Sequence, residues 1–417
     1  MSSRLEWQHH WRLPMAAALG YATACLYVYS LGPFIEPIQN EFGWSRSKVS
    51  SGVTLAAFFT AFFSVPIGML VDRVGPRRVG LIGVSMMCVS LAAIGTATGS
   101  DANWWFLWGL VALSTVPVQA TVWTAAVNSR FEHSRGLALA VTLSGASFAA
   151  AISPIIATAL ISELGWRHAY FVMCACWLMI VLPVMWWYFR GAQEQAVQHQ
   201  NVLDTARQLT GLDFKQGLRT SAMYKLIVAS GFYAFTVVGV VVHFVPLLRD
   251  QGVTPMSAAS IASLIGIFSV VGRLGTGFLL DRFPGHLVGA IAFLIPIVAC
   301  VMLLTMPQAL IAHTMAAIIF GLTLGSEVDV IAFLAARYFG MRHFGAIYGT
   351  MVMALSFGTA LGPLGAGMLY DRFEGYGPFL WLLMVLMGSS AIAVFSLRST
   401  PVVHGTVPSR SQTAPVN

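Results

Sequence analysis

One arginine lies inside a long apolar run of the sequence. Arg273 occurs in IFSVVGRLGTGFLLDR, residues 267–282, where the next charged residue is Asp281. If this run crosses a bilayer, an arginine near its centre costs about 2.5–3.5 kcal/mol on insertion scales. The guanidinium must then face a cavity or a partner. Its planar fork suits a carboxylate, which it can bind through two parallel N–H bonds. Arg273 is therefore a candidate anion-binding residue.

The composition is that of a membrane protein. The chain has 417 residues, of which 57% are hydrophobic and only 9% are charged. Soluble chains are roughly 25% charged, so this composition cannot cover a water-facing surface. Apolar runs of about 20 residues recur and are too long for barrel strands, which predicts an all-α polytopic membrane protein. The twelve expected spans are 14–38, 49–71, 79–98, 104–128, 137–162, 169–189, 223–248, 257–280, 286–305, 308–336, 344–370 and 378–397.

The net charge of +7 is unevenly distributed. With a cytoplasmic N-terminus, most Lys and Arg residues fall on the cytoplasmic side. The residues on the other side are Arg46, Lys48, Arg167, Arg249 and Arg372. This asymmetry follows the positive-inside rule and predicts a multi-pass protein of the cytoplasmic (inner) membrane with both termini in the cytoplasm. The basic charge reflects topology, so no nucleic-acid partner is expected.

The sequence offers little for cofactor or metal chemistry. Its five cysteines fall inside apolar spans without the spacing of zinc ligands, and we expect them to be small core residues. We find no Walker motif for ATP and no catalytic constellation, so we expect neither an enzyme nor a cofactor or metal. The first apolar run is long enough to remain as a span, which argues against a cleavable signal peptide.

Residue types recur at a fixed distance of 209 positions along the chain. The matched pairs are Gly68–Gly277, Asp72–Asp281, Arg73–Arg282, Gly136–Gly345 and Pro154–Pro363. The repeat predicts two pseudo-symmetric six-helix halves, 1–190 and 223–398, with a cytoplasmic central loop at 191–222 and a cytoplasmic tail at 399–417. Arg273 has no charged counterpart in the first half, as expected for a group at one central site between the repeats.

The connection between the second and third spans holds a recognisable motif. GMLVDRVGPRR, residues 68–78, resembles the G-x-x-x-D-R-x-G-x-R-R signature of the major facilitator superfamily at every specified position. The resemblance implies the major facilitator fold, with twelve transmembrane helices. In this family the motif is a conformational latch. The resemblance implies that role for Gly68, Asp72, Arg73, Gly75, Arg77 and Arg78.

Three further stretches resemble one branch of that superfamily, the oxalate/formate antiporters and monocarboxylate porters. They are LGPFIEPIQNEFGWSRSKVS (31–50), RGLALAVTLSGASFAAAISPIIATALISELGWRHAYF (135–171) and GSEVDVIAFLAARYFGMRHFGAIYG (325–349). Members of this branch carry an arginine in the eighth span that binds the substrate carboxylate, in a context like GRLGTG. The resemblance implies this role for Arg273.

The surroundings of Arg273 in the sequence narrow the expected substrate. Gly266, Ser269 and Gly277 share its helical face and are expected to leave room for a ligand. Oxalate-transporting relatives add a lysine in the eleventh span. This chain has none there, so a single cation favours a monocarboxylate. In proton-coupled animal members a lysine and an aspartate occupy the positions of Tyr29 and Ser269. The usual proton device is therefore missing.

Glu327 and Asp329 lie on the long tenth span. They are two positions apart and point to different sides of a helix, whereas Asp329 and Arg337 share a face. We favour a cytoplasmic gate network. The alternatives are proton carriage and a permanent ion pair with Arg273. His243, near the outer end of the seventh span, is also a proton-coupling or gate candidate, although a satisfied structural histidine is the favoured interpretation.

Other polar residues lie on spans that line the cavity in this superfamily. The candidates for substrate binding are Tyr27, Tyr29, Gln119 and Tyr233, together with Ser269. A tyrosine hydroxyl can share the second carboxylate oxygen. Taken singly, each of these residues fits helix packing or interfacial anchoring better.

These observations favour a secondary active transporter, a symporter or antiporter, that moves a small organic anion by alternating access. The favoured anion is a monocarboxylate, whose side chain is aliphatic, hydroxylated or aromatic. The alternatives are a dicarboxylate or organic-anion exchanger of the oxalate/formate type and a non-transporting membrane sensor on a carrier scaffold. Coupling is open among proton symport, exchange with a counter-anion and uniport. The other expected partner is the lipid bilayer.

Overall fold

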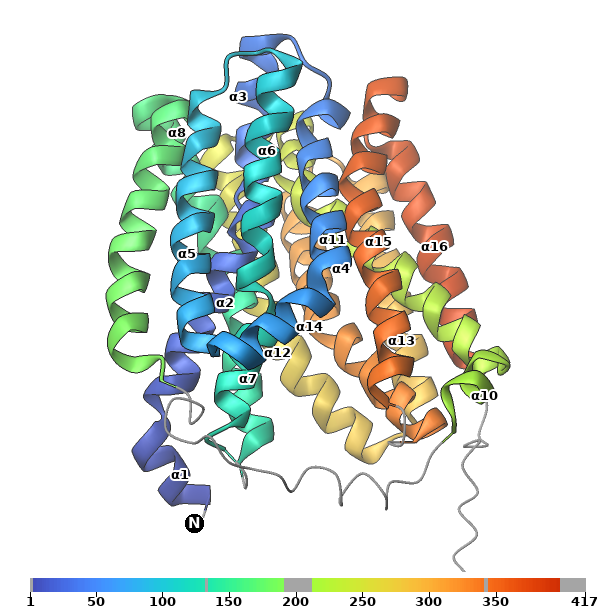
Figure 1. Ribbon diagram of the computed structural model, residues 1–417. Helices are drawn as coiled ribbons and strands as arrows, with labels where there is room; N and C mark the ends of the chain where they lie inside the picture. The colour runs from blue at the N-terminus through green and yellow to red at the C-terminus, as the bar shows by residue number, and fades with distance from the viewer. Residues whose placement is uncertain (1–2, 132–133, 191–211, 341–343, 398–417) are drawn as a thin grey trace, which may run out of the picture.

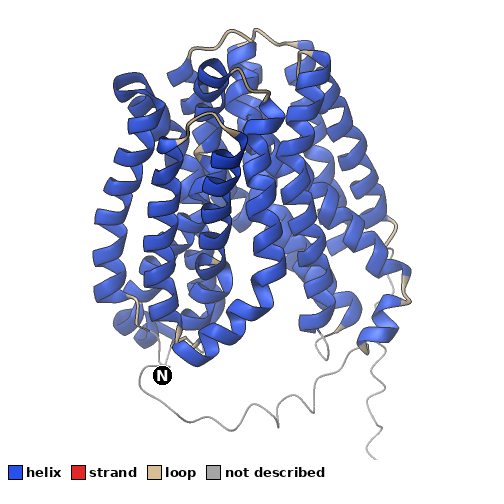
Figure 2. Ribbon diagram, turned by 45° about the horizontal axis from the view of Figure 1, so that its top comes forward, coloured by secondary structure: helices blue, strands red, loops and turns tan. Residues whose placement is uncertain are grey.

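The computed structural model describes residues 3–131, 134–190, 212–340 and 344–397 (Figure 1). For some residues within these ranges the structure describes the helical backbone but not the side chain. Among them are four positions of interest, Gly68, Asp72, Glu327 and Asp329. Throughout the described ranges the regular elements are helices, joined by short loops (Figure 2).

The first part of the chain contains helices α1–α8 and two 3-10 turns, which we call the N-terminal half. These elements are α1 (Ser3–His10), α2 (Arg12–Tyr29), α3 (Leu31–Phe42), α4 (Arg46–Val74), α5 (Pro76–Ala93), η1 (Ile94–Thr96), α6 (Asp101–Thr115), η2 (Val116–Val118), α7 (Ala120–Asn128) and α8 (Arg135–Tyr188).

Helices α10–α16 follow the central segment and form the C-terminal half. They are α10 (Phe214–Leu218), α11 (Ser221–Asp250), α12 (Pro255–Arg282), α13 (Gly285–Thr305), α14 (Leu310–Phe339), α15 (Phe344–Phe373) and α16 (Gly377–Phe395). The short helix α10 falls inside the segment that we expected to be a loop, and residues 191–211 and 398–417 lie outside the description.

Ten stretches of the described chain are long and apolar enough to cross a membrane. One of them, Arg12–Phe42, joins α2 and α3 into a single pass. Another contains all but the first residue of α8, which changes direction at Gly165 (φ 75°) and so makes two passes. Helix α4 is 29 residues long and runs alongside the others (Figure 1). The predicted fold class, an all-α protein with twelve membrane passes, is confirmed.

Local sequence explains where these helices begin and end. Ser45 precedes α4, and its hydroxyl accepts a hydrogen bond from the backbone N–H of Lys48, which caps the helix. Gly75 ends α4 with φ at 90°, a conformation that a side chain disfavours, and Pro76 then starts α5. The loop that we expected at 163–168 is reduced to the single non-helical residue Gly165.

The apolar core is divided along the sequence. One cluster of buried side chains consists of residues between Leu13 and Phe189, joined by Val242. Two other clusters consist of residues between Ala222 and Leu397. The N-terminal and C-terminal halves touch mainly where α4 meets α15, α8 meets α12 and α3 meets α11. Their interface is therefore a small set of helix pairs.

The bundle has two ends, which we name by their helices. The α1 end carries α1, α10 and the connection between α4 and α5, and lies at the bottom of Figure 1. The α3 end carries the connections between α3 and α4 and between α11 and α12, and lies at the top. The positive-inside pattern predicts that the α1 end is cytoplasmic.

Candidate substrate-binding site

Arg273 lies in the second half of α12, where this helix packs directly against α14. Its side chain is half-buried. A Cβ added to Gly325 of α14 would lie 1.8 Å from the carbonyl oxygen of Ser269 and 2.8 Å from the backbone nitrogen of Arg273. The two backbones are thus in contact, and only a glycine allows it. This contact fixes the point from which the guanidinium extends.

Two tyrosines of the N-terminal half lie within electrostatic range of Arg273. They are Tyr21 and Tyr29 of α2, and both side chains are only partly buried. Because the two residues are eight positions apart, they lie on one face of the helix, two turns from each other. A guanidinium from one half and two phenols from the other therefore approach a common region between the halves. Sequence analysis identified Tyr29 but missed Tyr21.

A third tyrosine comes from α15. Tyr348 lies within electrostatic range of Tyr21 and is half-buried. The C-terminal half thus contributes a cation and a phenol to the region that the N-terminal half approaches with Tyr21 and Tyr29. Tyr348 falls within the stretch 325–349, which resembles members of the family. The sequence alone does not indicate that this residue approaches Tyr21, because that depends on how the neighbouring helices pack.

The small residues that precede Arg273 on α12 allow α8 to pack closely against this helix. A Cβ at Gly266 would lie 2.2 Å from the backbone nitrogen of Ala151 and 2.5 Å from the carbonyl oxygen of Ser147, both on α8. Ser269 is 1% exposed, and its hydroxyl donates to Ser147 Oγ at 2.6 Å. These two positions therefore hold the halves together, whereas a Cβ at Gly277 would meet nothing within 4 Å.

The remaining substrate-binding candidates take part in contacts between helices. Tyr27 is 7% exposed and belongs to the core cluster of the N-terminal half. Tyr233 is 3% exposed, and its hydroxyl donates to the carbonyl oxygen of Leu324 at 3.2 Å. Gln119 lies at the junction of η2 and α7, where its amide donates to the carbonyl oxygen of Thr60 at 3.1 Å. All three contribute to packing between helices. Tyr27 also lies within electrostatic range of Tyr21 and Tyr29. The substrate-binding roles of these three residues stay predictions.

An ion pair joins the two halves at the α3 end. Arg46, the first residue of α4, is 7% exposed. Its guanidinium donates to both carboxylate oxygens of Asp250, at 2.8 and 2.9 Å, at the end of α11. It also lies 3.6 Å from the ring centroid of Tyr370 on α15 and donates to Gln39 at 3.2 Å. Sequence analysis treated Arg46 only as a charge on the outer side, so this network was missed.

His243 lies next to this ion pair, and its hydrogen bonds specify its tautomer. Its Nε2 is 2.9 Å from the carbonyl oxygen of Pro363, which can only accept, so Nε2 carries the proton. Its Nδ1 then accepts from the Tyr376 hydroxyl at 2.7 Å, and that oxygen accepts from Arg46 at 2.8 Å. Burial raises the pKa of Tyr376, which keeps its phenol protonated. Ser50 Oγ, 3.0 Å from Nε2, adds a contact from α4.

Further bonds cross between the halves at the same end. The carboxylate of Asp371 on α15 accepts from the backbone N–H groups of Arg46 and Ser47, at 2.9 and 3.0 Å, and so caps α4. Arg249 of α11 pairs with Glu36 of α3, with N–O distances of 3.0 and 3.2 Å. Together with the Arg46–Asp250 pair, these bonds close the α3 end.

The motif at the α1 end is partly described. Gly75 supplies the turn between α4 and α5, and Arg77 donates to the carbonyl oxygen of Trp186 at 2.5 Å, which ties the start of α5 to the end of α8. Arg73 and Arg78 are exposed. Gly68 and Asp72 lie outside the described side chains, and the latch role of the motif stays a prediction.

Two acidic candidates also lie outside the described side chains. These are Glu327 and Asp329, which the backbone places on α14. Arg337, on the last turn of the same helix, is exposed at the α1 end. The gate network and the proton-carrying role that we expected for these residues remain predictions.

Comparison with known proteins agrees with this architecture. A sequence model of the Major Facilitator Superfamily matches residues 17–363. Monocarboxylate transporter 13 of Bos taurus is 26% identical over 88% of this chain and 84% of its own length. A gallate transporter of Pseudomonas putida is 25% identical, over 89% of each chain. The crystal structure of a D-xylose-proton symporter superposes with a TM-score of 0.73 at 13% identity, over 92% of this chain and 97% of that one. The chain therefore belongs to the Major Facilitator Superfamily of membrane transporters.

Proposed function

We propose that this chain is a secondary active transporter of a small organic anion, and that the anion is a monocarboxylate. The observation that carries the proposal is the position of Arg273. It lies on a membrane-spanning helix, half-buried, and within electrostatic range of Tyr21 and Tyr29 of the other half. A guanidinium can hold a carboxylate through two parallel hydrogen bonds, and a phenol can share one of the oxygens or bind a hydroxyl group of the substrate.

A single carboxylate is favoured by the charges that the sequence supplies. The eleventh span, now α15, contains no lysine that could add a second cation for a dianion. The names of two relatives, a monocarboxylate transporter and a gallate transporter, support a substrate of this class. At about 26% identity they support the class without specifying the acid.

The closed α3 end suggests how the substrate moves. The Arg46–Asp250 and Arg249–Glu36 pairs must break before the halves can separate at that end. We propose that the halves rock about the α8–α12 contact, where Gly266 and Ser269 let the backbones approach. Arg273 lies next to this contact and so would stay near the pivot while either end opens. In this proposal the α1 end faces the cytoplasm.

Uptake of an anion needs a driving force. A membrane potential, negative inside, opposes entry by about 2.3 kcal/mol per charge per 100 mV. The transport cycle must then also carry a proton inward or a counter-anion outward. We propose that any proton is carried by Glu327, Asp329 or His243, or by the substrate itself. The other possibility is exchange with an internal anion.

The experiment is uptake into proteoliposomes with a panel of labelled solutes. Monocarboxylates with aliphatic, hydroxylated and aromatic side chains are compared with dicarboxylates and with the matching neutral amides. We expect saturable uptake of at least one monocarboxylate and none of its amide. Preferred exchange of a dicarboxylate would instead support the oxalate/formate type of exchanger. Absence of flux for the whole panel, in protein that binds a carboxylate, would indicate a sensor. Repeating the uptake with and without an imposed pH gradient separates symport from exchange and uniport.

A further inference from the structure

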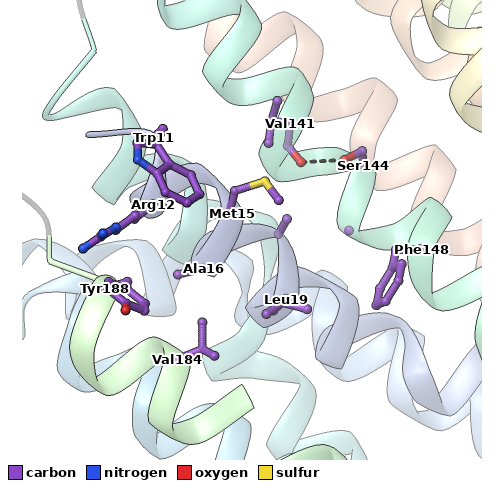
Figure 3. Close-up of a pocket in the computed structure, with 12 residues that line it drawn as sticks. Trp11, Arg12, Met15, Ala16, Leu19, Val141, Ser144, Phe148, Val184 and Tyr188 are labelled. Atoms are coloured by element: carbon purple, nitrogen blue, oxygen red, sulfur yellow. Dashed lines mark hydrogen bonds between the residues drawn. The ribbon is translucent and has the colours of Figure 1, made fainter. Parts of the chain in front are cut away.

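A groove of about 480 Å³ runs along the side of the N-terminal half near the α1 end (Figure 3). Its floor is α2, and its two walls are the parts of α8 before and after Gly165. The lining is almost entirely apolar and includes Met15, Leu19, Val141 and Val184. The volume is in the range of small-molecule sites.

One end of the groove carries a cation. Arg12 and Tyr188 lie there, and Phe148 lies at the other end (Figure 3). The guanidinium of Arg12 is 5.1 Å from the ring centroid of Tyr188 and 5.5 Å from that of Trp11. In the described part of the chain it makes no hydrogen bond or ion pair, so its N–H groups are available to an external acceptor.

Other arginines in the structure differ from Arg12 in this respect. Arg46, Arg167 and Arg249 each bond to a carboxylate of another helix. Arg12 is exposed beside two aromatic rings and has an apolar groove behind it. The combination of one cation and one apolar channel is complementary to an anionic head attached to a hydrocarbon chain.

The location of the groove indicates where such a molecule comes from. Trp11 and Tyr188 are 49% and 40% exposed, as aromatic residues at a membrane interface are, and Met15 and Phe148 are 53% and 45% exposed along the groove. The α1 end is the one at which basic residues gather, and Arg190 follows Tyr188 by two positions. The groove therefore opens toward the lipid of the leaflet whose surface is rich in anionic phospholipids.

We propose that this groove binds one anionic phospholipid. The phosphate of the lipid accepts hydrogen bonds from Arg12, and one acyl chain follows α2 past Met15 and Leu19 toward Phe148. Seven residues separate Arg12 from Leu19, which at about 1.5 Å per residue gives roughly 10 Å of contact for the chain. Trp11 and Tyr188 flank the head group at the interface.

The groove is also connected to the contact between the two halves. Ser144 and Phe148 line the groove, and Ser147 and Ala151, on the other side of the same helix, touch α12. A bound lipid would support the helix that carries this contact.

Native mass spectrometry of the purified protein tests the proposal. The protein is mixed with dioleoyl phosphatidylglycerol or dioleoyl phosphatidylcholine, and the fraction that retains one lipid is measured. We expect phosphatidylglycerol to be retained about tenfold more, because its phosphate is not offset by a choline charge. Arg12→Gln should remove this preference. Arg219→Gln, which removes an exposed arginine at the same end in the C-terminal half, should keep it.

Two further measurements test the acyl chain. Ser144→Trp fills the groove without changing its charge and should lower retention of phosphatidylglycerol about as much as Arg12→Gln. Dihexanoyl phosphatidylglycerol, tested on the unaltered protein, should be retained about tenfold less than the dioleoyl form. Equal loss in Arg12→Gln and Arg219→Gln would overturn the proposal, because Arg12 would then be an ordinary snorkelling residue. Equal retention of the two phosphatidylglycerols would overturn it as well.

Discussion

Arg46 of α4 and Asp250 of α11 form a bidentate ion pair that joins the two halves of the molecule, with N–O distances of 2.8 and 2.9 Å. The two residues are 204 positions apart in the sequence. The side chain of Arg46 is 8% exposed and that of Asp250 is 33% exposed, so the pair is only partly screened by solvent. It is the central bond of the closed α3 end.

Asp250→Asn should favour opening of the α3 end. The substitution leaves the buried guanidinium of Arg46 without its charged acceptor, and a hydrogen bond to a charged group contributes about 1.5–3 kcal/mol. The measurement is the distance between spin labels at Ala102 and Ser257, which are exposed at this end in the N-terminal and C-terminal halves. We expect the distribution to move to longer distances in a cysteine-free background.

A matched control is available at the same end. Glu41 bonds to Arg167 and Trp166 within the N-terminal half, so Glu41→Gln breaks an ion pair without touching the interface between the halves. It should leave the distance distribution unchanged. A shift of equal size in Glu41→Gln and Asp250→Asn would mean that the Arg46–Asp250 pair has no special part in closure.

The α3 end should stay closed on mild acidification, because the neutral form of His243 is the one that fits its buried site. Protonation would turn Nδ1 into a donor, so it could no longer accept from Tyr376, and it would place a positive charge near Arg46. The carboxylate of Asp371 on α15, also near, would offset this charge only in part because it already caps α4. The same spin-label distance, measured between about pH 7.5 and pH 5, should therefore not change.

His243→Gln tests this interpretation. A glutamine can donate to Pro363 and accept from Tyr376 as the neutral imidazole does, but it cannot take up a proton. The variant should remain closed at both pH values, as the unaltered protein does. An acid-induced opening of the unaltered protein that is absent in His243→Gln would contradict the expectation, because His243 would then take up a proton in this range.

Gly266→Ala should destabilise the contact between α8 and α12. The added Cβ would lie 2.2 Å from the backbone nitrogen of Ala151, and backbone atoms cannot move aside as a flexible side chain can. Overpacking of this kind costs about 1–3 kcal/mol. Thermal unfolding of the purified protein should occur several degrees lower. Gly275→Ala on the same helix meets nothing within 4 Å and should leave the midpoint unchanged or slightly higher, and an equal drop in both variants would contradict the close contact.

Tyr21→Phe and Tyr348→Phe should each weaken substrate binding. Both phenols belong to the region around Arg273, and loss of one hydrogen bond of about 0.5–1.5 kcal/mol corresponds to a roughly two- to tenfold rise in KM. Tyr170→Phe is the control, because Tyr170 is 1% exposed in the core of the N-terminal half. KM values from initial rates of uptake provide the comparison. Unchanged KM in all three variants would show that Tyr21 and Tyr348 do not bind the substrate.

The fold was largely predictable from the sequence because the membrane imposes a length on each helix. Most predicted spans end within a few residues of one observed helix, as for 223–248 and α11 (Ser221–Asp250). Two spans, 14–38 and 104–128, instead cover two successive helices each, α2 with α3 and α6 with α7. In a further case one residue replaces a loop. Gly165 allows α8 to turn without a connecting segment, which hydropathy alone does not distinguish from a short loop.

The site was predictable only in part. Arg273 stood out because a charge inside an apolar run needs an explanation, and Tyr29 was identified by its alignment with relatives. Tyr21 lies two helical turns from Tyr29, which is a usable signal once the inward face of α2 is known. The partnership of Arg46 with Asp250 has no such signal, because a contact between distant helices depends on how the halves dock.

The small residues near Arg273 illustrate a different difficulty. Gly266 and Ser269 suggested space for a ligand, but the structure fills that space with α8. A glycine in a membrane helix is as suitable for close helix packing as for a cavity, and one sequence does not distinguish the two.

The most direct test of the central claim is transport and substrate affinity in Arg273→Lys and Arg273→Ala, reconstituted after monodisperse purification. The account predicts that Arg273→Ala abolishes uptake of monocarboxylates. It predicts that Arg273→Lys lowers affinity by about tenfold or more, because an ammonium keeps the charge but cannot supply two parallel hydrogen bonds. Undiminished uptake and affinity in both folded variants would contradict it.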